Sequence, residues 1–200
     1  MEQKSVAIIG AAETTDLGKI PNLAQIQLHA DAALNAMADC GITAKDIDGI
    51  ATAGDSPASV AHYLGITPTW VDGTGVGGCS FMLHVRHAAA AINEGLCEVA
   101  LVTHGESGRS RIGRGGFAAA PATLPGQFEA PYGPAGPPSM FTIPVLRMMK
   151  ETGLTLEQLA SVAVVQREWA GMNPRAYMQD PITVEDVLES RMIAYPFRLL

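Results

Sequence analysis

Apolar runs alternate with amphipathic segments along the first half of the chain. Residues 6–9 form a continuous apolar run closed by Gly10, which predicts a strand buried on both faces. Further strands are expected at residues 47–53, 69–71 and 99–103, and helices at residues 23–40, 57–64 and 80–94. Because strands and helices alternate with short connections, we expect an α/β fold with a mostly parallel sheet covered by helices on both faces.

The pattern changes after this half. Between residues 105 and 140, Gly, Pro, Ala, Arg and Ser dominate, and neither a helical nor a strand period persists. Long loops inside compact domains are usually functional or disordered, so we expect a flap over a site, a segment that contacts a partner, or plain disorder. Thr155 and Gln158 form a capping box for a helix to about residue 170. Other helices are expected at residues 141–150 and 183–188, before an extended stretch at residues 192–200.

Composition narrows the classes of protein that the chain can represent. Its 200 residues are 48% hydrophobic, enough for one sizeable core, and we assign all of them to one domain. The 13 Lys and Arg residues are scattered and the net charge is −7, which argues against nucleic acid as a partner. The apolar run near the N-terminus is too short for a signal peptide or a membrane span, so we expect a soluble, cytoplasmic protein.

The three cysteines indicate free thiols. They are odd in number and lack CxxC spacing, which argues against a disulfide framework and against a zinc site, and we predict no metal. Cys40 ends an amphipathic helix and Cys97 enters a core strand, so both are expected to be packing residues. Cys79 follows a glycine-rich turn between a strand and a helix, and it is the candidate for chemistry.

Two functional interpretations compete for this turn. Gly73, Gly75 and Gly78 match the G-x-G-x-x-G fingerprint of dinucleotide sites, but the turn follows the third predicted strand, and the expected acidic residue is missing at the next strand tip. Alternatively, the helix dipole favours the thiolate of Cys79, which is the nucleophilic form of cysteine. Gly77, Gly78 and Ser80 would then lie against a bound thioester. A small buried cysteine that merely fits a tight turn remains a third possibility.

Polar residues follow the predicted strand at residues 99–103. His104 stands at its carboxyl end, where open α/β sheets bind ligands, and Glu106 comes two residues later, so both are candidate catalytic residues. Arg109 and Arg111 could steer a phosphate-bearing ligand or belong to a solvated face. His84 and His87 are expected to be structural, with Phe81, Val85, Ala88, Ala89 and Ile92 as the core stripe of their helix.

These segments together resemble the thiolase superfamily, and within it the lipid-transfer-protein or sterol-carrier-protein type thiolases of lipid metabolism and their thiolase-like aldolase relatives. The resemblance rests on VAIIGAAET, IDGIATAGD, GGCSFMLHVRHAAAAINEGLCEVALVTHGES, PYGPAGPPSMFTIPVLRMMKETG, GLTLEQLASVAVVQREWAGMNPRAY and SRMIAYPFRLL. It implies an N-terminal thiolase half with a mixed, mostly parallel five-stranded sheet, part of an αβαβα five-layer fold. A C-terminal half, absent from this chain, would complete that fold, usually in a tight homodimer.

The resemblance also bears on the nucleophile. In the family the nucleophilic cysteine opens a buried helix, and counting back from Gly95, the glycine that closes this helix, places it at Gly78. Cys79 is one residue late, and Phe81 stands where the motif has glycine. Cys79 is therefore either a shifted nucleophile or a residue of a member that lacks one. The second cysteine and the oxyanion-hole histidines of the family belong to its C-terminal half.

Three functions follow as expectations from the resemblance. The first is a thiolase-like acyltransferase, of the acetyl-CoA acetyltransferase kind, that forms or cleaves carbon–carbon bonds in coenzyme A thioesters without a covalently bound cofactor. The second is a thiolase-like retro-aldolase on a CoA-linked, sterol-type side chain. The third is a non-catalytic subunit or fragment. A second subunit or C-terminal half, and a small zinc-ribbon and OB-fold protein, are the expected partners beside acyl-CoA.

Overall fold

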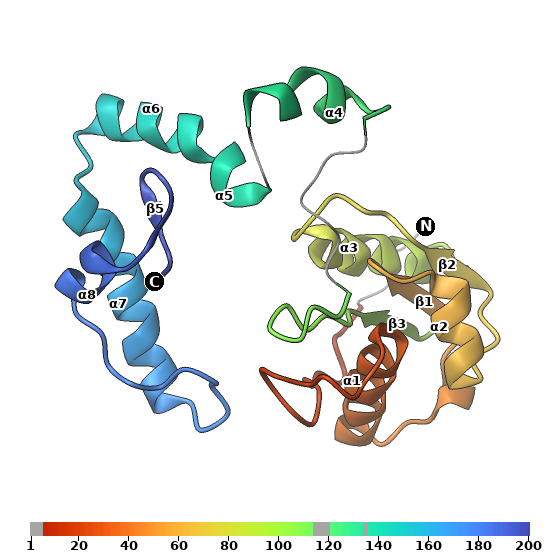
Figure 1. Ribbon diagram of the computed structural model, residues 1–200. Helices are drawn as coiled ribbons and strands as arrows, with labels where there is room; N and C mark the ends of the chain where they lie inside the picture. The colour runs from red at the N-terminus through yellow and green to blue at the C-terminus, as the bar shows by residue number, and fades with distance from the viewer. Residues whose placement is uncertain (1–5, 114–120, 134–135) are drawn as a thin grey trace. The chain divides into compact units, whose positions relative to one another are not determined.

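The computed structural model describes residues 6–113, 121–133 and 136–200 (Figure 1). The chain forms two compact units, Met1–Arg114 and Gly115–Leu200, each with its own internal packing. Assignment of all 200 residues to one thiolase-like domain stays a prediction. Within the described residues, no helix is long and apolar enough to cross a membrane.

A parallel sheet organises the first unit. Its strands β1 (Gly49–Thr52), β2 (Trp70–Asp72) and β3 (Ala100–Thr103) stand in the order β2-β1-β3, with Gly49 opposite both Trp70 and Ala100. Helices α1 (Gln25–Cys40) and α2 (Pro57–Leu64) lie on one side of the sheet and α3 (Ser80–Asn93) on the other, with the short turn η1 (Ala44–Asp46) before β1 (Figure 1). The predicted α/β fold with a parallel sheet is confirmed.

The main apolar core lies between the sheet and the α1–α2 layer. Ile50 and Leu101 contribute from neighbouring strands and are buried, because alternate strand residues face this layer. The core consists of Ala33, Met37, Ile47, Ile50, Val60, Ala61, Ile66 and Leu101. Gly41 and Gly65 end α1 and α2 with positive φ angles of 75° and 72°, a conformation that glycine adopts without strain.

The predicted first strand is wrong. Residues 6–9 run without strand pairing, and Ile8 and Ile9 are 77% and 58% exposed. The run is followed by Gly10, which packs so closely on α1 that a Cβ there would lie 2.6 Å from the Ala36 carbonyl oxygen, and by Ala11, whose N–H donates to Asp39. These contacts hold the segment beside α1. The sheet therefore has three strands within the described residues, where the resemblance to thiolases implied five.

Helices dominate the second unit. They are α4 (Leu124–Phe128), η2 (Ala130–Tyr132), α5 (Pro137–Met140), α6 (Thr142–Thr152), α7 (Leu156–Met172) and α8 (Val184–Glu189), followed by the hairpin β4 (Met192–Ala194) and β5 (Phe197–Arg198). The prediction of an unstructured segment at residues 105–140 is thus wrong for α4, η2 and α5; residues 114–120 and 134–135 lie outside the described residues. Proline stands at the first or second position of all three short helices, where its missing N–H has no intrahelical partner to lose.

One capping box was predicted from the sequence, and the C-terminal hairpin was not. Thr155 accepts from the N–H of Gln158 at 3.2 Å and Gln158 accepts from the N–H of Thr155 at 2.9 Å, so the predicted start of α7 is confirmed. Thr183 and Asp186 open α8 in the same way. The single extended stretch expected at residues 192–200 is instead a hairpin.

Candidate active site at the carboxyl edge of the sheet

The carboxyl ends of β1 and β3 bring the predicted polar residues to the edge that α3 approaches. His104 follows β3 directly, and its ring centroid lies 4.5 Å from that of Phe81 in the first turn of α3. Its Nε2 is 3.3 Å from Oε2 of Glu106, and its Nδ1 is 3.4 Å from the carbonyl oxygen of Ala53, just after β1. The two side chains are 39% and 43% exposed, so this pair of candidates is accessible to a ligand.

A second histidine, not predicted as a candidate from the sequence, lies behind this pair. His29 of α1 is fully buried, its Nδ1 is 2.5 Å from the hydroxyl of Thr103, and its ring meets that of His104 edge to face at 6.2 Å. Burial lowers the pKa of His29 to about 4, an effect that the charge of Asp55 partly offsets and His104 reinforces. His29 is therefore neutral near pH 7. The available signal was its position, three residues after Ile26 and four before Ala33 on the apolar stripe of α1.

Cys79 occupies the cap position at the N-terminus of α3, and it is exposed. Its Sγ lies 3.7 Å from the carbonyl oxygen of Val76, at the limit of a sulfur hydrogen bond. The thiol is not packed in the core, so the interpretation of Cys79 as a buried residue of a tight turn is wrong. Within the described residues, no hydrogen bond or ion pair joins Cys79 to a histidine or a carboxylate.

Ser80 closes the glycine-rich turn from within. It is 1% exposed, its hydroxyl donates to the carbonyl oxygen of Gly77 at 2.6 Å, and it accepts from the N–H of Val76 at 3.0 Å. Gly77 and Gly78 are exposed, and Gly77 has a φ of 83°, which favours glycine. The turn therefore presents glycine backbone and the thiol of Cys79 to solvent, while Ser80 stabilises it from inside. Contacts of these residues with a thioester stay a prediction.

The core stripe predicted for α3 is rotated from the observed one. The buried residues are Ser80, His84, Ala88 and Ala91, whereas Val85 is 44% exposed. His84 donates through Nε2 to the carbonyl oxygen of Thr74 at 2.9 Å, which leaves its buried Nδ1 without a partner within the described residues. A buried polar side chain thus replaces a predicted apolar one, because the turn before α3 supplies a carbonyl for it.

His87 ties α3 to the end of β2. Its Nδ1 lies 2.7 Å from Asp72, whose other carboxylate oxygen accepts from the N–H and the hydroxyl of Thr74 at 2.8 Å and 2.7 Å. Burial alone would raise the pKa of Asp72, but the hydrogen bonds from Thr74 and His87 outweigh it and lower that pKa to about 2. This network fixes the turn that carries Cys79. Both histidines of α3 thus make structural contacts.

Arg109 and Arg111 lie in a turn beyond Glu106. Ser107 and Ile112 bridge this turn, and Ser107 and Ser110 fasten it to the backbone of Gly18 and Ile20. No hydrogen bond or ion pair between the described residues joins Arg111 to His104 or Cys79. The role of both arginines toward a phosphate stays a prediction. The described part of the chain contains no group of three His, Cys, Asp or Glu side chains that could hold a metal ion.

A parallel α/β unit with a helix N-terminus, an exposed thiol and a His–Glu pair at one sheet edge is an arrangement suited to acyl chemistry. Comparison with known proteins narrows the class of protein to which the chain is similar. The chain is 32% identical over 209 aligned residues to the 17-hydroxy-3-oxo-4-pregnene-20-carboxyl-CoA lyase of Mycobacterium tuberculosis, and 33% identical over 213 to the steroid side-chain-cleaving aldolase of Thermomonospora curvata. It is 29% identical over 208 to the acetyl-CoA acetyltransferase of Methanothermobacter thermautotrophicus.

Solved structures show the same relationship. The "Ltp2-ChsH2(DUF35) aldolase" superposes with a TM-score of 0.79 over 96% of this chain and 52% of that chain, at 31% identity. A monomeric SCP2-thiolase like protein from Mycobacterium smegmatis shares the fold, with a TM-score of 0.70 over 95% of this chain and 41% of that chain at 21% identity. No family model matches the sequence. The chain is therefore similar to steroid side-chain aldolases and acetyl-CoA acetyltransferases, and it shares its fold with an SCP2-thiolase like protein.

The chain spans about half the length of the curated relatives it matches. The alignments cover 99% and 98% of this chain but 53% and 52% of the mycobacterial lyase and the Thermomonospora aldolase. The acetyl-CoA acetyltransferase is covered to the same extent, 53%. Roles that depend on the rest of such a protein therefore belong to the proposal that follows.

Proposed function

We propose that this chain contributes one part of an enzyme that forms or cleaves carbon–carbon bonds in coenzyme A thioesters. The relatives are named as a CoA lyase, an aldolase and acetyl-CoA acetyltransferases. The observation that carries the proposal is the juxtaposition at the sheet edge. There the His104–Glu106 pair contacts the first turn of α3 through Phe81, and exposed Cys79 caps that helix.

Acyl transfer would use Cys79 as nucleophile. Its thiolate attacks the thioester carbonyl, the bond from that carbon to the CoA sulfur breaks, and the CoA thiolate leaves and takes up a proton. The α-carbanion of a second acyl-CoA then attacks the acyl-cysteine, which forms the new carbon–carbon bond and releases the Cys79 thiolate. His104, oriented by Glu106, would carry the protons. Gly77, Gly78 and Ser80 would hold the turn against the acyl group, with Arg109 and Arg111 toward the phosphates of CoA.

Retro-aldol cleavage is a second candidate, and a specific observation favours it. Cys79 contacts no base among the described residues, whereas His104 and Glu106 lie 3.3 Å apart. In this reaction a base removes the proton from a β-hydroxyl group, the bond between the α and β carbons breaks, and the resulting enolate of the CoA ester takes up a proton at its α carbon. No acyl-cysteine forms.

Two variants of the complete enzyme separate these reactions. If acyl transfer operates, Cys79→Ala abolishes turnover, and an acyl adduct on Cys79 appears by mass spectrometry of protein incubated with acyl-CoA. If cleavage is retro-aldol, Cys79→Ala stays active, no adduct forms, and His104→Gln lowers kcat by about 10²-fold or more, the usual contribution of a general acid–base group. Full activity in both Cys79→Ala and His104→Gln would overturn the proposed site.

The partners of the chain are also part of the proposal. We expect a homodimer in the cytoplasm, completed by a C-terminal thiolase half or a second subunit, and a small zinc-ribbon and OB-fold protein beside it. A solved relative whose name joins two components, Ltp2 and ChsH2(DUF35), supports the search for a hetero-complex. Mass measurement of the purified particle tests this. A particle that contains only this chain and has no activity on acyl-CoA would favour the non-catalytic function.

A further inference from the structure

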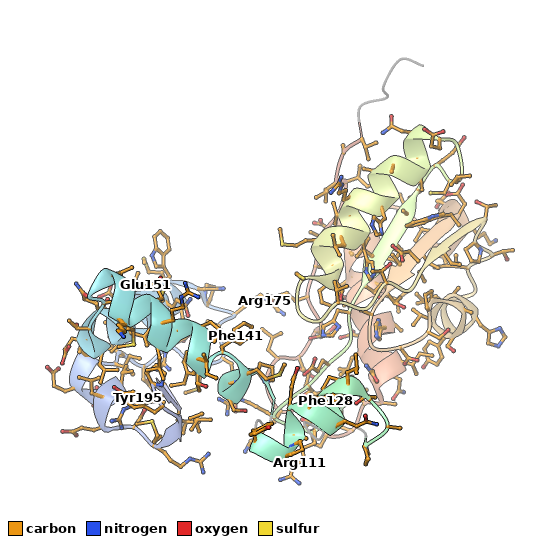
Figure 2. The ribbon with its side chains drawn as sticks, turned by 90° about the horizontal axis from the view of Figure 1, so that it is seen from above. Arg111, Phe128, Phe141, Glu151, Arg175 and Tyr195 are labelled. Atoms are coloured by element: carbon orange, nitrogen blue, oxygen red, sulfur yellow. The ribbon has the colours of Figure 1, made fainter. Side chains whose placement is uncertain are left out.

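The second unit contains an apolar hollow that includes no residue of the Cys79–His104 edge. It lies between α5, the first turn of α6 and the hairpin β4–β5, and it is open to solvent, with a volume of about 480 Å³. This volume lies within the roughly 300–1,000 Å³ typical of small-molecule sites. Its lining consists of Pro137, Pro138, Phe141, Val145, Ile193, Phe197 and Arg198. Figure 2 labels Phe141 on the helical side and Tyr195 on the hairpin of this unit.

Arg198 is the one charged side chain in this lining. Its Nη1 donates to the carbonyl oxygen of Ser190 at 2.8 Å, and Ser190 is itself held by the end of α8 through its N–H and hydroxyl. The guanidinium is therefore fixed at the hollow by its hydrogen bond to the end of α8. Within the described residues, its other N–H groups have no hydrogen-bond acceptor and no carboxylate pairs with it.

A half-buried guanidinium without a counter-ion favours an anionic ligand. Arginine keeps its charge at all physiological pH values, and its planar group matches the oxygens of carboxylates and phosphates in paired hydrogen bonds. Proline, phenylalanine, valine and isoleucine side chains around it offer no competing polar group. These lining side chains favour a ligand that also carries an apolar group, because burial of both apolar surfaces releases water.

We propose that this hollow binds an amphipathic anion. Its apolar chain or ring system lies against Phe141, Ile193 and Phe197, and its acid group bonds the free N–H groups of Arg198. The acid group is either the carboxylate of a free acid or a phosphate of an acyl-CoA. This site uses no residue of the Cys79–His104 edge, so its test is independent of the proposed reaction.

Methyl NMR of the 200-residue chain, labelled at Ile and Val, tests the site directly. The probes are decanoate, kept below its micelle concentration, and the neutral decan-1-ol. Decanoate shifts the methyl signals of Val145 and Ile193, and decan-1-ol binds roughly tenfold more weakly, as expected for loss of a charge-assisted hydrogen bond. Shifts confined to Val162 and Val165, exposed apolar residues of α7, would overturn the proposal because they indicate non-specific adsorption.

Variants at the guanidinium isolate its contribution. Arg198→Gln lowers the affinity for decanoate roughly tenfold and leaves that for decan-1-ol unchanged, whereas Arg198→Lys keeps part of the preference. Arg191→Gln is the matched control, since Arg191 is exposed on the same segment and does not line the hollow. Unchanged α7 methyl signals show that each variant is folded. Equal decanoate affinity in the parent chain and Arg198→Gln contradicts the proposal.

A third probe identifies the source of the acid group. Decanoyl-CoA that binds more tightly than decanoate at the Val145 and Ile193 methyls assigns the acid group to a CoA phosphate. Tighter binding of decanoate assigns it to a free carboxylate. Failure of both compounds to shift these methyls overturns the site. Activity of the Cys79 and His104 variants is measured separately, so failure of the hollow and failure of the proposed reaction are distinguishable.

Discussion

The Nδ1 atom of His29 and the hydroxyl of Thr103 meet at 2.5 Å inside the first unit, joining the middle of α1 to the last residue of β3. Nε2 of His29 has no partner within the described residues. A buried histidine with one satisfied nitrogen is stable only as the neutral ring, because the imidazolium would need a second acceptor. This contact lies directly behind His104, and it makes the stability of the first unit depend on pH.

We expect the free energy of unfolding to fall between pH 6.5 and pH 4. Burial lowers the pKa of His29 to about 4, so over this range the unfolded chain binds a proton at His29 that the folded chain does not. Above pH 6.5 His29 is neutral in both states, and its full contribution to stability is present. The loss is at most roughly 1.4 kcal/mol per pH unit. Urea unfolding at pH 7.0, 6.0 and 5.0 measures it.

His29→Gln removes this component of the pH dependence. The matched control is His62→Gln, because His62 is exposed near the end of α2 and its side chain makes no hydrogen bond or ion pair within the described residues. The control keeps the slope of the parent chain. An equal slope in His29→Gln and the parent would contradict the assignment of a low pKa to His29.

Gly105 is expected to tolerate no side chain. A Cβ at this position would lie 2.5 Å from Cδ2 of His29 and 2.7 Å from both the carbonyl oxygen of Gln25 and the N–H nitrogen of His29. Two of these atoms are backbone and cannot move away cheaply. Gly105→Ala should lower the free energy of unfolding by about 1–3 kcal/mol, as overpacking usually does. Gly75→Ala, which would meet no atom within 4 Å, is the control in the same urea experiment.

Local signals explain what the sequence could predict. The capping box of Thr155 and Gln158 lies within one helical turn, so the start of α7 is visible in the sequence alone. The parallel sheet could be predicted in the same way, because strand and helix patterns alternate along the first half of the chain. In contrast, the contact of His29 with Thr103 joins residues 74 positions apart, and nothing local marks either as a partner. Candidate residues can be chosen by position in the chain, but their mutual contacts depend on the sheet.

Two errors have the same long-range cause. The apolar run at residues 6–9 has the composition of a buried strand, but packing of Gly10 on α1 places it outside the sheet. The core face of α3 includes His84 because the carbonyl oxygen of Thr74 accepts from it. Apolar periodicity detects neither the lack of a neighbouring strand nor the hydrogen-bond acceptor that allows a polar side chain to be buried.

Cys79 should react with iodoacetamide before the other cysteines. It is exposed, whereas Cys97 is 3% exposed and burial, together with the charge of Asp48, raises the pKa of the Cys97 thiol. At pH 7.5 we expect modification of Cys79 at least roughly tenfold faster than that of Cys97. Peptide mapping by mass spectrometry over time measures both rates. Faster labelling of Cys97 in folded protein would show that the turn before α3 is closed over Cys79.

Asp72 should hold the turn that carries Cys79. Its carboxylate receives two hydrogen bonds from Thr74 and one from His87, and Asp72→Ala leaves these donors without their acceptor. We expect the free energy of unfolding at pH 7 to fall by about 1–3 kcal/mol. Because hydrogen bonds lower the pKa of Asp72 to about 2, its contribution is present above pH 3.8 and is lost as the pH falls toward 2.

Glu94→Gln, at an exposed carboxylate after α3, is the control. Urea unfolding at pH 7 and pH 3 distinguishes them, since Asp72→Ala alone should flatten this acid-dependent loss. If Asp72→Ala and Glu94→Gln behave alike, the network from β2 to α3 does not stabilise the turn, and the exposed position of Cys79 needs another cause.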